Sequence, residues 1–89
     1  MINREIKIIN KLGLHARAAA KFVTLASQYS SDVKLVLKGQ SINGKSIMGV
    51  MMLAASQGTE LTLITDGEDE ANAMDALDEL IRNRFGEEE

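Results

Sequence analysis

The sequence predicts an α+β fold, in which a mostly antiparallel sheet is solvated on one face and covered by helices on the other, as a two-layer sandwich. Two observations carry this prediction. Apolar residues alternate with charged ones in segments 2–9 and 32–38, and lysines occupy positions that face water. Elsewhere apolar residues recur at helical spacing, so that the elements follow in the order βαββαβα.

The four predicted strands rest on alternation and on turn residues. Besides segments 2–9 and 32–38, a short strand is expected at 41–43 after a tight turn at Gly39-Gln40, and a fourth at 60–65. The residues predicted to face the helices are Ile2, Arg4, Ile6 and Ile8 in the first strand and Val33, Leu35 and Leu37 in the second.

Three helices are predicted between and after the strands. The first covers residues 16–27, the second covers 47–53 with Ser46 as its N-cap, and the third begins at the acidic residues 68–70, which its dipole favours. The residues expected on the buried faces are Ala19, Phe22, Val23 and Ala26 in the first helix and Ala71, Met74, Leu77, Leu80 and Ile81 in the third. Residues 86–89 are expected to form a frayed acidic tail.

Length and composition narrow the functional classes. The 89 residues are expected to form one domain, spanning residues 1–89, and the lack of cysteine excludes disulfides and thiol chemistry. The first ten residues alternate charge and isoleucine rather than forming the apolar core of a signal peptide, and no run is long enough for a membrane span. A cytoplasmic location is therefore expected, without membrane insertion.

Charge is divided unevenly along the chain. Residues 1–45 hold eight basic and two acidic residues, a net +6, whereas residues 46–89 hold two basic and eleven acidic residues, a net −9. Such asymmetry favours a basic face that attracts acidic ligands or proteins. Nucleic acid is not expected as a partner, because one tyrosine and two phenylalanines offer little surface for base stacking.

The single histidine, His15, lies where the first strand gives way to an alanine-rich helix. A helix N-terminus presents unpaired N–H groups and a partial positive charge, which suits an anion. With Arg17 two residues further on, the imidazole is suited to carry a phosphoryl group. A cap or loop histidine is the simpler alternative. No metal site or cofactor is predicted, because one histidine without cysteine leaves only carboxylates as further ligands.

Residues 39–46 (GQSINGKS) match the phosphate-loop pattern G-x-x-x-x-G-K-[ST], and the apolar segment 61–66 ends in an aspartate that could hold magnesium. Taken alone, this predicts a small nucleotide-binding enzyme that uses Lys45 and Ser46. The context argues against it, since phosphate-loop strands are buried on both faces, whereas Lys34 and Lys38 interrupt this strand.

The short helix at 47–53 is apolar on nearly all sides, which indicates either burial or an exposed patch. Flexible methionines suit a surface that fits several partners, so a docking surface is the favoured interpretation over core. The residues assigned to this surface are Ala20, Lys45, Ile47, Met48, Met51 and Met52.

Two motifs together resemble the histidine phosphocarrier (HPr) family of the bacterial sugar phosphotransferase system. Residues 13–17 (GLHAR) match the family's active-site motif, and residues 45–51 (KSIMGVM) match its regulatory-serine motif. The similarity extends over essentially the whole chain. It implies an open-faced sandwich with a four-stranded sheet of order 1-4-2-3 under three helices.

The resemblance also implies a function. His15 would accept a phosphoryl group on Nδ1 from phosphorylated Enzyme I and pass it to a IIA component, with Ala16, Arg17 and Ala18 stabilising the phosphate. Ser46 would be the target of HPr kinase/phosphorylase. Such a protein is a reactant in a relay rather than a turnover enzyme, and a monomer is expected.

One position departs from the family pattern, which usually has proline directly after the arginine, where this chain has Ala18. The departure leaves the branch open, because the chain could be a paralogue that belongs to a nitrogen-related phosphotransfer system. A separate alternative is a regulatory binding module switched at Ser46 without phosphotransfer.

Overall fold

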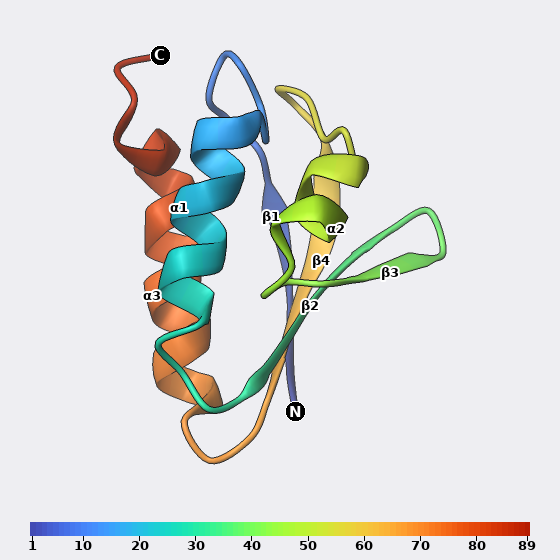
Figure 1. Cartoon of the computed structure of the whole chain (residues 1–89), viewed down its shortest axis with the longest axis vertical. Coiled ribbons are helices and arrows are strands. Elements are labelled where there is room, and N and C mark those ends of the chain that lie inside the picture. The colour runs from blue at the N-terminus through green and yellow to red at the C-terminus, as the bar shows by residue number, and fades with distance from the viewer.

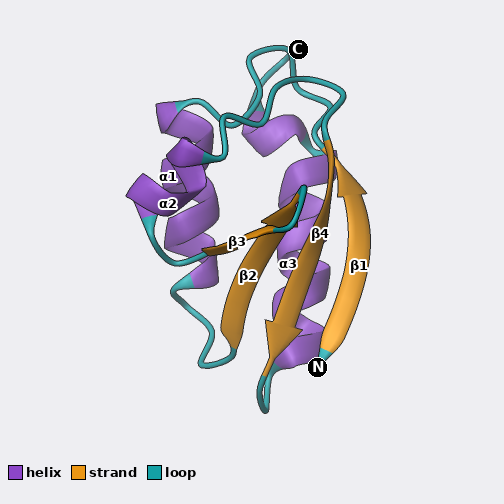
Figure 2. Ribbon diagram, turned by 90° about the vertical axis from the view of Figure 1, so that its right-hand side faces the viewer, coloured by secondary structure: helices purple, strands orange, loops and turns teal.

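A computed structural model describes all residues 1–89 and contains the predicted sandwich (Figures 1 and 2). Four antiparallel strands form one sheet in the order β1-β4-β2-β3: β1 (Ile2–Lys7), β2 (Asp32–Leu37), β3 (Gln40–Asn43) and β4 (Glu60–Asp66). The helices are α1 (Ala16–Ala26), α2 (Ile47–Met52) and α3 (Glu70–Arg82), followed by a 3-10 turn, η1 (Arg84–Gly86). Figure 2 shows the helices gathered on one side of the sheet, so the predicted fold and strand order are confirmed.

The alternation of the strands separates a buried face from a solvated one. The two central strands, β4 and β2, pair with Leu63 opposite Leu35, and both side chains are buried. On the same face Ile6, Ile8 and Val33 are buried, while Ile2 and Leu37 are half-buried against the core. Lys34 and Lys38 are exposed, as predicted.

The turn between β2 and β3 lies one residue earlier than predicted. Leu37 pairs with Gln40, so the two-residue loop is Lys38-Gly39, with φ of 50° and 80°. Positive φ at both central residues matches the right-handed twist of the flanking strands, and glycine adopts it without strain.

The buried faces of α1 and α3 agree with the predicted spacing except at one position. Ala19, Phe22 and Ala26 are buried, as are Met74, Leu77 and Ile81, while Val23 and Leu80 are partly buried. Ala71, expected on the buried face, is exposed, and Ala73 is buried instead. Successive helix residues are about 100° apart, so Ala73 lies directly above Leu77 whereas Ala71 points away.

The expected frayed tail is wrong. Residues 84–89, here called the strap, run on past the end of α3 (Figure 1). They lie beside the N-terminal end of α1 and the loop that precedes this helix, where Glu87 contacts His15 and Glu89 contacts Lys11. Phe85 is fully buried, and its carbonyl oxygen accepts a hydrogen bond from Lys21 Nζ at 2.7 Å. The main-chain N–H of Lys11 donates to the main-chain oxygen of Glu89 at 2.9 Å. Burial of one aromatic ring and these bonds offset the entropy of ordering the strap.

None of the helices has the length and apolar character needed to cross a membrane.

Candidate functional site

His15 is the N-cap of α1 and is held by the loop that connects β1 to this helix. Gly13, with φ of 68°, turns the chain, and the N–H of Leu14 donates to the carbonyl of Ala55 at 2.8 Å. The carbonyl of His15 accepts the first helical hydrogen bond, from Ala19 at 2.8 Å. The imidazole makes no capping bond and its side chain is 28% exposed, so it is available at the surface.

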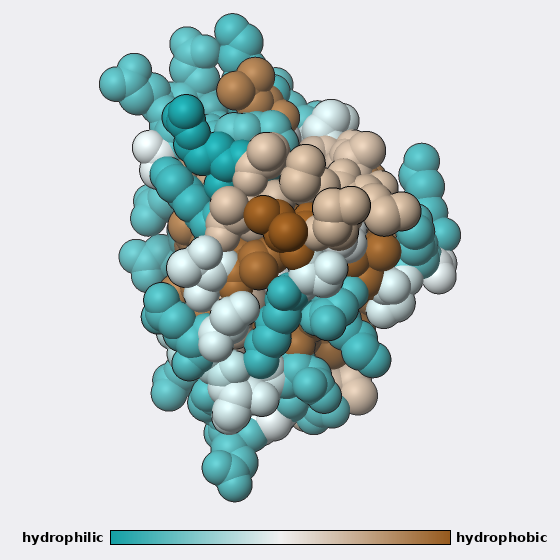
Figure 3. Space-filling model, in the orientation of Figure 1, coloured by the Kyte–Doolittle hydropathy of each residue, from teal (hydrophilic) through white to brown (hydrophobic).

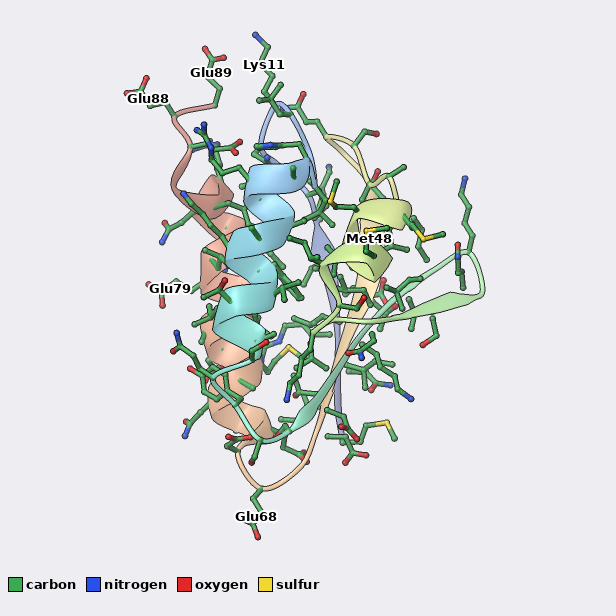
Figure 4. The ribbon with its side chains drawn as sticks, in the orientation of Figure 1. Lys11, Met48, Glu68, Glu79, Glu88 and Glu89 are labelled. Atoms are coloured by element: carbon green, nitrogen blue, oxygen red, sulfur yellow. The ribbon has the colours of Figure 1, made fainter.

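The start of α1 forms the positive part of the site. Ala16, Arg17 and Ala18 are its first three residues, and their N–H groups have no acceptor within the helix. Ala16 and Arg17 are exposed, whereas Ala18 is fully buried. The residues that line the surface depression at this point are Lys11, Leu12, His15, Ala16, Arg17, Glu87, Glu88 and Glu89. Cationic groups and the helix N-terminus thus face the carboxylates of the strap, and Figure 4 shows Lys11, Glu88 and Glu89 at the same end of the molecule.

Glu87 contacts His15 directly, which sequence reasoning did not anticipate. Its Oε2 is hydrogen-bonded to His15 Nε2, and its Oε1 accepts from Asn10 Nδ2 at 2.9 Å. The same amide of Asn10, a fully buried residue, also donates to the carbonyl of Gly13 at 2.8 Å. The hydrogen bond from Asn10, and secondly the one from His15, lower the pKa of the Glu87 carboxyl below its ordinary value.

Ser46 is the N-cap of α2, as predicted, and its Oγ accepts from the N–H of Gly49 at 3.1 Å. Neighbouring Lys45 extends toward the end of α1, where its Nζ donates to the carbonyl of Tyr29 at 2.7 Å.

The phosphate-loop interpretation conflicts with this geometry. Within the matching segment 39–46, residues 40–43 are strand β3, paired with β2. The N–H of Gly44 donates to the carbonyl of Val33 at 2.7 Å, so it is occupied within the sheet rather than turned toward a phosphate. A phosphate loop instead directs successive N–H groups into one open cradle.

Helix α2 presents an exposed apolar surface. Val50 and Leu53 are buried beneath it, whereas large side chains on its outer side are 41–70% exposed: Ile47, Met48, Met51 and Met52. These four residues are here called the α2 patch. Figure 3 shows apolar side chains gathered over this helix, and Met48 points outward in Figure 4. Ala20 is half-buried and borders a different hollow, with Arg17 on α1 and Leu80 on α3.

Comparison with known proteins places this geometry in a family. The family model described as the PTS HPr component phosphorylation site matches residues 2–83. Phosphocarrier protein HPr of Cupriavidus necator is 60% identical over the full length of both chains. The solved structure of HPr from Thermoanaerobacter tengcongensis is 47% identical and covers both chains fully, with a TM-score of 0.96. The chain belongs to the HPr family of the bacterial phosphotransferase system, whose members are phosphocarrier proteins and not turnover enzymes.

A further similar structure is that of Crh, the catabolite repression protein of Bacillus subtilis, described as a domain-swapped, intertwined dimer. It is 45% identical, with a TM-score of 0.76, and the alignment covers 94% of this chain and 97% of Crh. The expectation that this chain is a monomer therefore stays a prediction.

Proposed function

We propose that this protein relays a phosphoryl group from phosphorylated Enzyme I, through His15, to a IIA component of the phosphotransferase system. The observation that carries the proposal is the position of His15: a partly exposed imidazole at the N-cap of α1, beside the exposed Arg17. A shallow site of this kind suits transfer between two proteins, because a donor can reach the ring without opening the fold.

The residues around the ring suit a phosphoryl group. A neutral imidazole attacks phosphorus, and the transferred group brings negative charge to the N-terminus of α1. There the free N–H groups of Ala16 and Ala18 and the guanidinium of Arg17 stabilise the charge. Arg17 makes no hydrogen bond or ion pair within the chain, so the N–H groups of its guanidinium are free to bind phosphate oxygens.

The α2 patch is the surface proposed to receive both partners. Four exposed apolar side chains on one short helix provide apolar area without a rigid shape, which suits two different proteins. Ala20 and Lys45 are proposed to contribute to the edge of the interface.

Ser46 is the proposed regulatory site, phosphorylated by HPr kinase/phosphorylase. A phosphate there adds about two negative charges directly beside Ile47 and Met48. It would therefore weaken docking of an acidic partner on the α2 patch without a change of fold.

The test is intact-mass analysis after incubation with Enzyme I, magnesium and phosphoenolpyruvate. The wild-type chain is expected to gain one acid-labile phosphate, and His15→Ala none. Phosphate on both would place the acceptor elsewhere. No phosphate on either, with an Enzyme I that phosphorylates a known HPr, would reject the relay.

A second candidate is a regulatory binding module switched at Ser46, favoured by the 45% identity to Crh. It requires phosphorylation at Ser46 without transfer through His15, and the same experiment separates the two. A place in a nitrogen-related branch of the system is the other alternative, which transfer assays with IIA proteins of each branch would distinguish.

A further inference from the structure

The strap brings a carboxylate onto one particular nitrogen of the histidine. The contact joins Glu87 Oε2 to His15 Nε2, and the structure gives Nδ1 no hydrogen-bond partner. A carboxylate whose pKa is lowered is ionised at neutral pH and can only accept a hydrogen bond. Nε2 must therefore carry the proton, which leaves the lone pair of the neutral ring on Nδ1.

The carboxylate is fixed from several sides. Asn10 Nδ2 holds the second oxygen at 2.9 Å, and this amide is itself buried and bonded to the carbonyl of Gly13. Two residues before Glu87, the ring of Phe85 is buried and its carbonyl is held by Lys21. The side chain of Glu87 is only 14% exposed. Water therefore competes weakly for this hydrogen bond, and the ring has one preferred orientation.

We propose that Glu87 is a positioning residue for phosphoryl transfer, which holds His15 in the Nε2–H tautomer and so presents Nδ1 to the phosphoryl donor. This inference rests on the proposed function of His15. The strap lies beyond residues 2–83 that the family model matches. Asn10 acts on the histidine indirectly: its amide orients the carboxylate of Glu87 and also binds the carbonyl of Gly13 in the loop that carries His15.

The transfer step balances without a proton having to leave. The Nδ1 lone pair of His15 forms the new N–P bond while the N–P bond of the phosphohistidine donor breaks, and the donor nitrogen keeps that electron pair. The ring of His15 retains its proton on Nε2 and gains positive charge as Nδ1 becomes bonded to phosphorus. Glu87 offsets this charge, just as a buried aspartate orients a catalytic histidine and stabilises its imidazolium form.

The test compares Glu87→Ala with Glu79→Ala as the matched control, because Glu79 is an exposed residue of α3, away from the strap, whose side chain has no hydrogen bond or ion pair. Nitrogen-15 NMR of the imidazole, at a pH where the ring is neutral in every variant, reports which nitrogen carries the proton. We expect almost pure Nε2–H tautomer in the wild type and in Glu79→Ala, and a several-fold rise of the Nδ1–H form in Glu87→Ala. Glu87→Gln, whose amide oxygen still accepts a hydrogen bond, is expected to restore the Nε2–H tautomer but not the negative charge beside the ring.

Phosphotransfer from Enzyme I is measured on the same samples. Glu87→Ala is expected to slow transfer about tenfold, by analogy with the lower end of the loss seen when a carboxylate that orients a metal-bound histidine is removed. Equal tautomer ratios and equal rates in Glu87→Ala and Glu79→Ala would overturn the inference while leaving the carrier role intact. Failure of the wild-type chain to take phosphate would instead overturn the proposed function, and this inference with it.

Discussion

Lys21 Nζ donates a hydrogen bond to the carbonyl oxygen of Phe85 at 2.7 Å, joining the middle of α1 to the start of the strap. Phe85 needs such support. Its φ is 55°, in the left-handed region that bulky side chains avoid, yet its ring is fully buried. Burial of the ring and the bond from Lys21 together offset this strain, and they determine where Glu87 lies two residues later.

Lys21→Met should loosen the strap while preserving the fold. Loss of a hydrogen bond from a charged donor at a partly buried site is expected to cost about 1.5 kcal/mol, the lower end for charged groups. The N–H groups of Gly86 and Glu87 are bonded to Asn83 and Arg84, so their hydrogen exchange reports the order of the strap. We expect faster exchange at both amides in Lys21→Met and no change in Lys34→Met, which alters an exposed lysine of the sheet. Equal exchange in the two variants would show that Phe85 alone holds the strap.

The acid stability of the fold should depend on Asp69, which links the N-terminus of α3 to the start of β2. The hydroxyl of Ser31 donates to this carboxylate, as do the N–H groups of Ser30 and Ser31 at 2.9 and 3.0 Å. The Ser31 hydroxyl, followed by the main-chain donors, lowers the pKa of Asp69 from 3.8 to about 2. A carboxyl whose pKa is lowered by folding stabilises the folded state above its unfolded pKa and loses this effect as the pH falls through the folded value.

Asp69→Asn is therefore expected to be less stable than the wild type at neutral pH, with the difference shrinking between pH 3.8 and about 2. Urea unfolding at a series of pH values measures the difference. Glu68→Gln is the control, because Glu68 is an exposed neighbour without a hydrogen bond, and its difference from the wild type should stay near zero. If the difference in unfolding free energy between Asp69→Asn and the wild type does not change with pH, the substitution acts through packing or hydrogen-bond geometry and not through the charge of Asp69.

The sequence predicted the sheet and the helices because their signals are local. Alternation in β2 and the spacing of apolar residues in α1 depend only on neighbours within a turn or a strand. The strap carries no such signal, since its hydrogen bonds join residues 72 and 77 positions apart. Phe85, one aromatic residue just after a helix, was the available clue that the polar segment behind it would be held in place. For the same reason His15 was found from the sequence, while its partners Glu87 and Asn10 were not.

Ser46 has a structural role that substitutions can separate from the proposed regulation. As N-cap it accepts from the N–H of Gly49, and Ser46→Ala is expected to lower the free energy of unfolding by about 1 kcal/mol. Ser46→Asp keeps a capping oxygen, so its stability should stay near that of the wild type while transfer from Enzyme I slows. Urea unfolding and transfer rates measure both effects, with Ser41→Ala on exposed β3 as the control. Slow transfer in Ser46→Ala as well would point to loss of helix order instead of added charge.

Ala18 is the third residue of α1, where the N–H has no acceptor within the helix. Ala18→Pro is expected to stabilise the fold by about 0.4–1 kcal/mol, because proline restricts the unfolded chain. Ala20→Pro is the matched control: two residues further on, proline removes a helical hydrogen bond and should cost about 3 kcal/mol. Thermal unfolding distinguishes them. A lower melting temperature for Ala18→Pro would show that the buried space around Ala18 does not admit the ring.

Gly13→Ala should disturb both stability and transfer, since Gly13 sets the path of the chain into His15. Its φ is 68°, and a Cβ there would overlap the carbonyl oxygen of Ala55 and lie 2.8 Å from the Cα of Ser56. Left-handed backbone costs alanine about 1–2 kcal/mol by itself. Gly58→Ala is the matched control, because Gly58 has φ of 89° but nothing within 4 Å of the added Cβ. Both variants carry the cost of the left-handed backbone, so the additional loss of unfolding free energy in Gly13→Ala measures the overlap with residues 55 and 56.

That overlap is also expected to move the loop and slow phosphotransfer through His15, whereas Gly58→Ala should transfer at the wild-type rate. Equal stability and equal rates in the two variants would mean that the loop yields without displacing the histidine.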